Sequence, residues 1–236
     1  MKIKHLPLTI NPNQNRYHFY ETLWKQVDLN LLLSHETELK NYTLLDYGCG
    51  RGETLALAKQ LGIKAIGTDV EEECVQASRQ YGEAHLLNAN DPVAQFGVKS
   101  FDIVTCFHVL EHVPSPVETL NHLRKIARKY ILLAVPNLSA FHDILRPYRW
   151  LDSVNEGHLQ SWDHATFLNL VERHSSLKLI AWGFDTVIIP PISNLLVRLL
   201  GNGITIFIET NIFKRMHPYA SHSIIALAKP IDRSDQ

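Results

Sequence analysis

The 236-residue chain lacks a strong net charge, because 23 lysines and arginines face 24 aspartates and glutamates, which gives a formal charge of −1. Proteins that bind nucleic acid through its phosphates usually present a strongly basic surface. The charge balance therefore argues against nucleic acid as a substrate or partner. The length fits one large domain, or one domain with an insertion.

Cysteine is also scarce. Cys49, Cys74 and Cys106 are odd in number and form no C-x-x-C pair, which argues against a disulfide framework and favours a reducing compartment. The first residues, Met1 to Pro7, contain no apolar run of the kind that signal peptides carry. From these two absences we expect a cytoplasmic protein.

An unbroken apolar run of the roughly 20 residues that a membrane span needs is absent too. The best candidate, residues 186–213, has only Arg198 and Glu209 as charged residues, but the pair that begins at Pro190 and two glycines, the first of them Gly201, interrupt it. We therefore expect two short helices in an apolar insertion, and no transmembrane span.

Three interpretations of that insertion, residues 190–218, stay open. It could pack on the core or join two copies into a homodimer, it could cover a hydrophobic substrate as a lid, or it could touch a membrane surface. A lid would contact a lipid-like acceptor through apolar side chains, and the expected contacts are Leu195, Leu196, Leu199, Ile206 and Phe207, with Phe141 and Trp150 from an earlier loop.

What the chain does contain is an apolar segment, Leu44–Tyr47, that runs into Gly48, Gly50 and Gly52, followed by a helix-forming stretch. This order of strand, glycine turn and helix brings bare backbone against a nucleotide-like ligand in α/β folds. A second apolar run ends in Asp69, about 20 positions after the first glycine, where a carboxylate can accept ribose hydroxyls. These features alone fit a dinucleotide-binding oxidoreductase equally well.

Further residues point elsewhere. Asp46 precedes the turn, Cys49 lies inside it, and a later apolar segment, residues 100–106, leads into the run from Phe107 to Val113 that contains Leu-Glu-His. With these motifs in this order the chain resembles the class I S-adenosylmethionine-dependent methyltransferases, and within them the ubiquinone-pathway type of small-molecule O-methyltransferase. The resemblance covers residues 43–179.

The resemblance implies an α/β fold with a doubly wound, Rossmann-like sheet, parallel except for an antiparallel last strand. The alternation of apolar segments and helix patterns supports it. We expect an N-terminal helical cap over residues 1–42, in which the helix pattern runs from Arg16 to Lys40, and a methyltransferase domain over 43–236. Further strands are expected at 177–189 and near the end of the chain.

The resemblance also implies S-adenosylmethionine as cofactor. Asp46 and the turn residues Gly48, Cys49, Gly50 and Gly52 would hold its methionine part, Asp69 its ribose and Val70 its adenine. The resemblance further implies Asn88, Ala89 and Asn90 near the adenine, and Phe107 as another cofactor-binding residue. An amide at Asn88 or Asn90 stands where the family usually has an acid.

His108, Glu111 and His112 form a second group, which would share one face if the segment were helical. Imidazole and carboxylate are metal ligands. The resemblance implies a divalent metal site at this place, with His158 as a possible fourth ligand. The resembled enzymes carry an acid at the position of His108. An imidazole there would shift the metal preference of the site from magnesium toward zinc, iron or nickel.

Histidine also suits proton transfer near neutral pH, so His108, His112 and His158 are alternative candidates for a catalytic base. Simple packing and hydrogen bonding is the third possibility for each. The predicted activity is methyl transfer, at oxygen, to a small or lipid-like acceptor. The competing hypotheses are a nicotinamide-dependent oxidoreductase and a cofactor-binding scaffold without catalysis.

Overall fold

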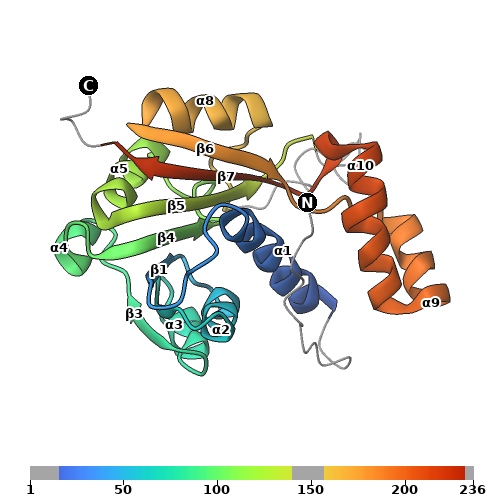
Figure 1. Cartoon of the computed structure of the whole chain (residues 1–236), viewed down its shortest axis with the longest axis horizontal. Helices are drawn as coiled ribbons and strands as arrows, with labels where there is room; N and C mark the ends of the chain where they lie inside the picture. The colour runs from blue at the N-terminus through green and yellow to red at the C-terminus, as the bar shows by residue number, and fades with distance from the viewer. Residues whose placement is uncertain (1–15, 140–156, 232–236) are drawn as a thin grey trace.

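The structure is a computed structural model that describes residues 16–139 and 157–231 (Figure 1). Its centre is a seven-stranded sheet in the order β3-β2-β1-β4-β5-β7-β6. The strands are β1 (Thr43–Tyr47), β2 (Lys64–Asp69), β3 (Glu83–Leu86), β4 (Phe101–Phe107), β5 (Ala127–Pro136), β6 (Leu177–Phe184) and β7 (Ser223–Pro230). Only β7 runs antiparallel to its neighbours, β5 and β6. The expected fold class is confirmed.

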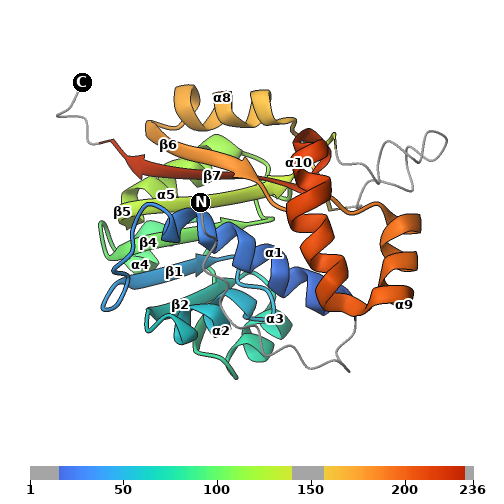
Figure 2. The same ribbon diagram turned by 45° about the vertical axis from the view of Figure 1, so that its right-hand side comes forward.

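Helices cover both faces of this sheet (Figures 1 and 2). They are α1 (Arg16–Leu33), α2 (Glu53–Gln60), α3 (Glu72–Ser78), α4 (Pro92–Phe96), α5 (Pro116–Ile126), α8 (His164–His174), α9 (Pro190–Phe207), the π-helical turn η1 (Ile208–Phe213), α10 (Lys214–Met216) and the 3₁₀ turn η2 (Pro218–Ala220). Side-chain caps set several helix starts: Ser115 accepts a hydrogen bond from the Glu118 amide, and Asp163 from the Thr166 amide.

Two hydrophobic cores lie on opposite faces of the sheet, because successive strand residues point to opposite sides. Leu44 packs with α1 and α2, whereas its neighbour Leu45 packs with α5 and α8. The same division separates Leu132 from Leu133 in β5. Both faces being buried explains why these strands are almost wholly apolar.

Two expected boundaries are wrong. The first helix ends at Leu33 rather than at Lys40, and the strand that begins at Leu177 ends at Phe184 rather than at residue 189. In each case the apolar pattern continues beyond the regular element: Leu39 and Val187 are buried in loops. The apolar pattern of a sequence cannot distinguish a buried residue in a loop from a buried residue in a helix or strand.

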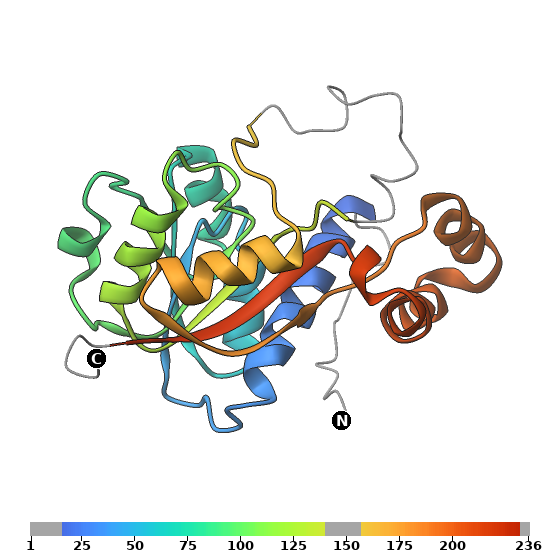
Figure 3. The same ribbon diagram turned by 90° about the horizontal axis from the view of Figure 1, so that it is seen from above.

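The apolar insertion forms two helical arms that project from the body of the molecule (Figures 2 and 3). Gly201 has φ 77° and ψ 171°, which breaks the helical path and separates the arms. By length and composition Ile192–Met216 could cross a membrane, with a mean hydropathy of 1.3. The break leaves each arm shorter than the roughly 20 residues that a span needs. We call residues 190–216 the hairpin.

Candidate active site

The candidate site lies where the carboxyl ends of β1, β2 and β4 meet, at one edge of the sheet. The turn after β1 is fixed to β2, since the amides of Gly48 and Cys49 both donate to the carbonyl oxygen of Thr68, at 2.8 and 2.9 Å. Loops that follow parallel strands gather at this edge and form the ligand sites of open α/β sheets.

The three glycines of the turn have different reasons for lacking a side chain. All have positive φ, which disfavours other residues. A Cβ on Gly48 would lie 2.1 Å from Cγ2 of Val109, and one on Gly52 would meet the Ser78 backbone at 2.9 Å. At Gly50 nothing lies within 4 Å. Only Gly50 therefore leaves free space, and Val109 covers the turn from the β4 side.

Asp69 joins the turn to the end of β2. Its Oδ2 accepts a hydrogen bond from the Gly50 amide at 2.9 Å, and its Oδ1 accepts one from the Glu71 amide at 3.1 Å. A carboxylate oxygen has two lone pairs, so each oxygen keeps one acceptor position for a ligand hydroxyl. The next residue, Val70, is 61% exposed, as an apolar wall for a flat ring system would be.

Asp46 is fully buried between β1 and β4. Its Oδ1 accepts a hydrogen bond from the Thr105 hydroxyl at 2.7 Å, while its Oδ2 has no hydrogen-bond partner among the described residues. Burial raises the pKa of Asp46 to about 6, against opposing effects of Lys25 and Thr105. A buried carboxylate oxygen without a hydrogen bond favours the protonated carboxyl group.

The other expected cofactor residues divide into two groups. Asn88, Ala89 and Asn90 are exposed just beyond β3. The side chains of Cys49 and Phe107 are buried, with the Cys49 thiol 3.6 Å from the Ser78 hydroxyl oxygen. Cys49 can therefore offer a ligand its backbone rather than its thiol. The assignment of all five stays a prediction.

The segment after β4 is a turn and not a helix. His108, Glu111 and His112 therefore do not share one helical face. His108 adopts φ 57°, and residues 110–112 form the turn. The structure nevertheless gathers Glu111, His112 and His158, whose ligand atoms all lie within 4.8 Å of one another. We call these three residues the ligand triad.

Backbone contacts hold the triad together across 45 residues. The amides of Leu159 and Gln160 donate to the Glu111 carbonyl oxygen at 2.7 and 3.1 Å, which places His158 beside it. Nδ1 of His112 lies 3.0 Å from the Gly157 carbonyl oxygen. Because a carbonyl only accepts, Nδ1 carries a proton, and in the neutral ring the lone pair is on Nε2.

Glu111 is the unusual member of the triad. It is 1% exposed, and neither of its carboxylate oxygens has a hydrogen-bond partner among the described residues. Two imidazole nitrogens, Nδ1 of His108 and Nε2 of His112, lie 3.5 and 4.0 Å from its Oε1. A buried carboxylate without partners is costly unless a cation neutralises it. One carboxylate and two imidazoles, one of them with a fixed tautomer, are a donor set that suits zinc, iron or nickel better than magnesium. The residues therefore fit a divalent metal.

His108 lies outside the triad. Its Nδ1 is 3.5 Å from Oε1 of Glu111, and its Nε2 is 3.2 Å from the Ser223 hydroxyl. Both ring nitrogens thus face protein groups. Burial lowers the pKa of His108, although Glu111 acts in the opposite direction. Burial also lowers the pKa of His158. Both rings are therefore biased toward the neutral form.

Several residues at the site have no signal in the sequence. His222 stacks on Trp24 of α1 with ring centroids 3.9 Å apart, and its Nδ1 lies 3.0 Å from the Ser223 hydroxyl and 3.7 Å from Oδ2 of Asp185. Lys25 of α1 approaches the Phe107 ring to 5.4 Å. They come from α1, from the residue that follows β6 and from the residue that precedes β7, so only the sheet order brings them to β4.

A groove of about 730 Å³ runs beside α1. It is bounded by the end of β6, by α1 and by the inner side of the hairpin, and its lining includes Leu23, Val27, Leu31, Phe184 and Ile206. Of the expected acceptor contacts among the described residues, Ile206 lines the groove. Leu196 is half-buried and does not line it, and Leu195, Leu199 and Phe207 are more than half exposed. Phe141 and Trp150 lie outside the described residues.

Comparison with known proteins gives one family and a consistent fold. The family model described as methyltransferase domain matches residues 17–175. Ubiquinone biosynthesis O-methyltransferases are similar over part of the chain: that of Hydrogenovibrio crunogenus is 32% identical over 97 residues, and that of Coxiella burnetii 34% over 90. These matches cover 38% and 36% of this chain. They cover only 40% and 38% of the relatives, so the chain spans well under half of their length.

Among solved structures, magnesium protoporphyrin IX methyltransferase from Synechocystis, with bound S-adenosylhomocysteine, aligns with a TM-score of 0.62 at 17% identity, over 93% of this chain and 89% of that one. A methyltransferase from Archaeoglobus fulgidus aligns with a TM-score of 0.58 at 19% identity, over 91% and 100%. At these identities the likeness concerns the fold.

Proposed function

This chain belongs to the methyltransferase domain family, and we propose that it transfers the methyl group of S-adenosylmethionine to an oxygen of a small, lipid-like acceptor. The observation that carries the proposal is the turn from Asp46 to Gly52 with Asp69 bonded to its centre. An open Gly50 beside a carboxylate with two unused acceptor positions suits the methionine and ribose parts of this cofactor.

The bound cofactor would supply a methyl group already activated on a sulfonium. The protein has to align the acceptor, exclude water and remove a hydroxyl proton. Of the three histidines, His112 is best suited to take that proton, because its ring is 42% exposed and its Nε2 lies 4.0 Å from Oε1 of Glu111, beyond hydrogen-bond distance. His108 would position Glu111 and Ser223. The sequence alone does not distinguish the three histidines as candidates for the catalytic base.

The ligand triad would hold a divalent metal, with Glu111, His112 and His158 as ligands. A metal there would lower the pKa of an acceptor hydroxyl. If the metal takes Nε2 of His112, that nitrogen is not available as a base, so the two roles are alternatives for one atom. His108, whose Nδ1 lies 3.5 Å from Oε1 of Glu111, would then be the remaining candidate for the base.

The groove supports a lipid-like acceptor. Its apolar lining suits an alkyl or prenyl chain, each buried CH₂ of which contributes roughly 0.8 kcal/mol. Its wall at Asp185 contacts His222, which adjoins Ser223 and His108. The relatives' names assign O-methylation to those proteins, which favours oxygen. We further propose a cytoplasmic site of action, since all three cysteines are free thiols.

Calorimetry with S-adenosylhomocysteine and with NADH tests the proposal. We expect binding of the first alone, and Asp69→Ala should weaken it by on the order of 1.5–3 kcal/mol per lost charge-assisted bond. Glu71→Ala, two positions away on an exposed side chain, is the control. Binding of NADH instead would identify an oxidoreductase. Binding of S-adenosylhomocysteine without methylation of an alkyl catechol or any other acceptor would leave a scaffold.

A further inference from the structure

The outer side of the hairpin carries an unusual concentration of exposed apolar side chains. Only 11% of its most apolar window is buried. The large apolar residues with at least 45% exposure are Ile192, Leu195, Leu199, Leu200, Ile204, Phe207, Ile212 and Met216. Ile192, Leu195 and Leu199 recur at helical spacing on one side of the first arm. A concentration of exposed apolar side chains of this kind marks a contact site.

The inner side of the hairpin is anchored, so the apolar side faces outward. Thr205 and Glu209 are fully buried, and Ile206 packs against Leu23 of α1. Partial burial lowers the pKa of Lys214, while Asp185 and Asp28 act in the opposite direction. The hairpin therefore cannot turn its exposed side to the body without separating these groups.

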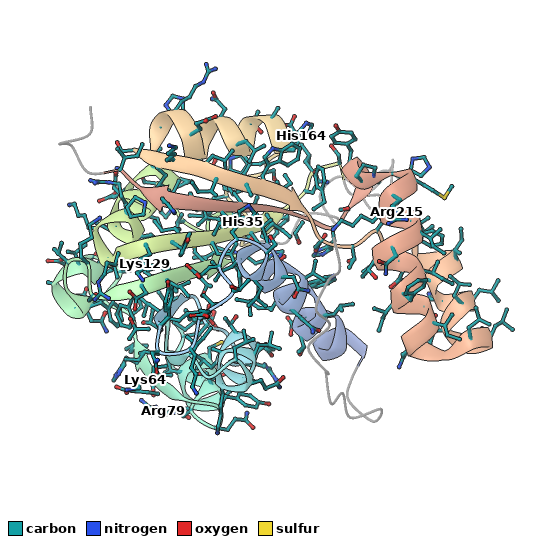
Figure 4. All side chains as sticks on the ribbon, in the orientation of Figure 1. His35, Lys64, Arg79, Lys129, His164 and Arg215 are labelled. Atoms are coloured by element: carbon teal, nitrogen blue, oxygen red, sulfur yellow. The ribbon has the colours of Figure 1, made fainter. Side chains whose placement is uncertain are left out.

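The exposed charges on the hairpin are of one sign. Arg198 and Arg215 are exposed, whereas its one acid, Glu209, is fully buried. Side chains extend from both arms beyond the ribbon, with Arg215 near the end of the second arm (Figure 4). Apolar and basic side chains together match the boundary between the acyl chains and anionic headgroups of a lipid bilayer.

We propose that the hairpin docks the protein on an anionic membrane surface without crossing the bilayer. The apolar side chains on either side of Gly201 enter the headgroup boundary, and Arg198 and Arg215 meet lipid phosphates. A second copy is the less suitable occupant: an interface of two identical patches would bring the arginines toward each other with no exposed acid on the hairpin to pair with them.

Co-sedimentation of the full chain with vesicles tests this without requiring turnover. We expect it to pellet with phosphatidylcholine–phosphatidylglycerol vesicles more than with pure phosphatidylcholine. The double variant Leu199→Gln/Ile204→Gln should lose at least nine-tenths of the binding, and Arg198→Gln should weaken it about fivefold. Val98→Gln, at a site 66% exposed on the body, should bind like the wild type.

Thermal melts and S-adenosylhomocysteine binding of each variant establish that it is folded. The proposal is overturned if the wild type stays in the supernatant with both vesicle types, or if the double variant pellets as well as the wild type. It is also overturned if light scattering shows a dimer that the double variant converts to a monomer. Loss of vesicle binding with unchanged cofactor affinity would support it independently of the proposed methyl transfer.

Discussion

At the scale of single residues, the site and the helix α1 beside it contain buried acids whose carboxylate oxygens lack hydrogen bonds. Asp46, Glu111 and Asp28 each have at least one carboxylate oxygen buried without a hydrogen bond among the described residues. Desolvation of this kind favours the protonated acid or an external cation. Burial raises the pKa of Asp46 and of Asp28, so these two acids bind protons more readily in the folded protein. For Glu111 the buried carboxylate favours an external cation.

Asp46 predicts a pH dependence of stability. Its pKa rises on folding from 3.8 to about 6, so the folded state binds the proton more tightly, and stability falls as pH rises through that range. The loss amounts to roughly 3 kcal/mol. Asp46→Asn, which keeps an acceptor for Thr105, should remove this contribution.

Urea unfolding at pH 4 and pH 7 measures it. The difference in unfolding free energy between Asp46→Asn and the wild type should be larger at pH 7 than at pH 4. A difference that is the same at both values would show that Asp46 titrates normally in the folded protein.

Glu111 predicts metal dependence. Purified wild-type protein should contain near-stoichiometric divalent metal by elemental analysis, and Glu111→Gln should lose it, because an amide is a poorer ligand than a carboxylate. A chelator should lower the Tm of the wild type but not that of the variant. Glu172→Gln, an exposed site on α8, is the control. Wild-type protein that is purified without metal, and whose Tm neither a chelator nor added zinc changes, would show that Glu111 has no ligand role.

At the scale of elements, α1 matters because it closes the site from the side of β7. Trp24 provides that contact twice: its ring stacks on His222, and its indole N–H donates to the Thr186 hydroxyl at 3.1 Å. We expect Trp24→Ala to destabilise the protein by about 3 kcal/mol. Trp24→Phe keeps a stack and loses only the hydrogen bond, at about 1 kcal/mol.

Denaturant unfolding gives the two values. Equal losses for Trp24→Ala and Trp24→Phe would mean that the stack contributes nothing and that the hydrogen bond alone holds α1. A loss in neither variant would mean that α1 docks through Leu29 and Leu32, which are buried against the sheet.

Two adjacent residues of the hairpin, Ile206 and Phe207, lie in different surroundings. Ile206 lines the groove, whereas Phe207 is 57% exposed on the other side. We expect Ile206→Gln to raise the KM for an alkyl catechol about tenfold, the loss that burial of one aliphatic side chain implies. Phe207→Gln should leave that KM unchanged. Equal effects of the two substitutions in steady-state assays would place the acceptor outside the groove.

At the scale of the whole molecule, local patterns predicted most of the sheet. The glycine turn and the alternation of strands and helices follow from runs of neighbouring residues, whereas the antiparallel last strand is expected only from the family resemblance. The site was only partly accessible in this way. Glu111, His112 and His158 come together because backbone amides of 159 and 160 bind the Glu111 carbonyl, which no spacing encodes. The division of the chain at residue 42 stays a prediction.

The placement of β7 between β5 and β6 has a consequence for synthesis on the ribosome. The strand is made after every other strand of the sheet, and it brings Ser223 to His108. In a nascent chain that ends before it, the edges of β5 and β6 that pair with β7 are both open, and open edges invite pairing with other chains. We infer that the emerging protein passes through an inactive stage in which it depends on chaperones, and that chains cut short before residue 223 aggregate rather than persist as partial enzymes.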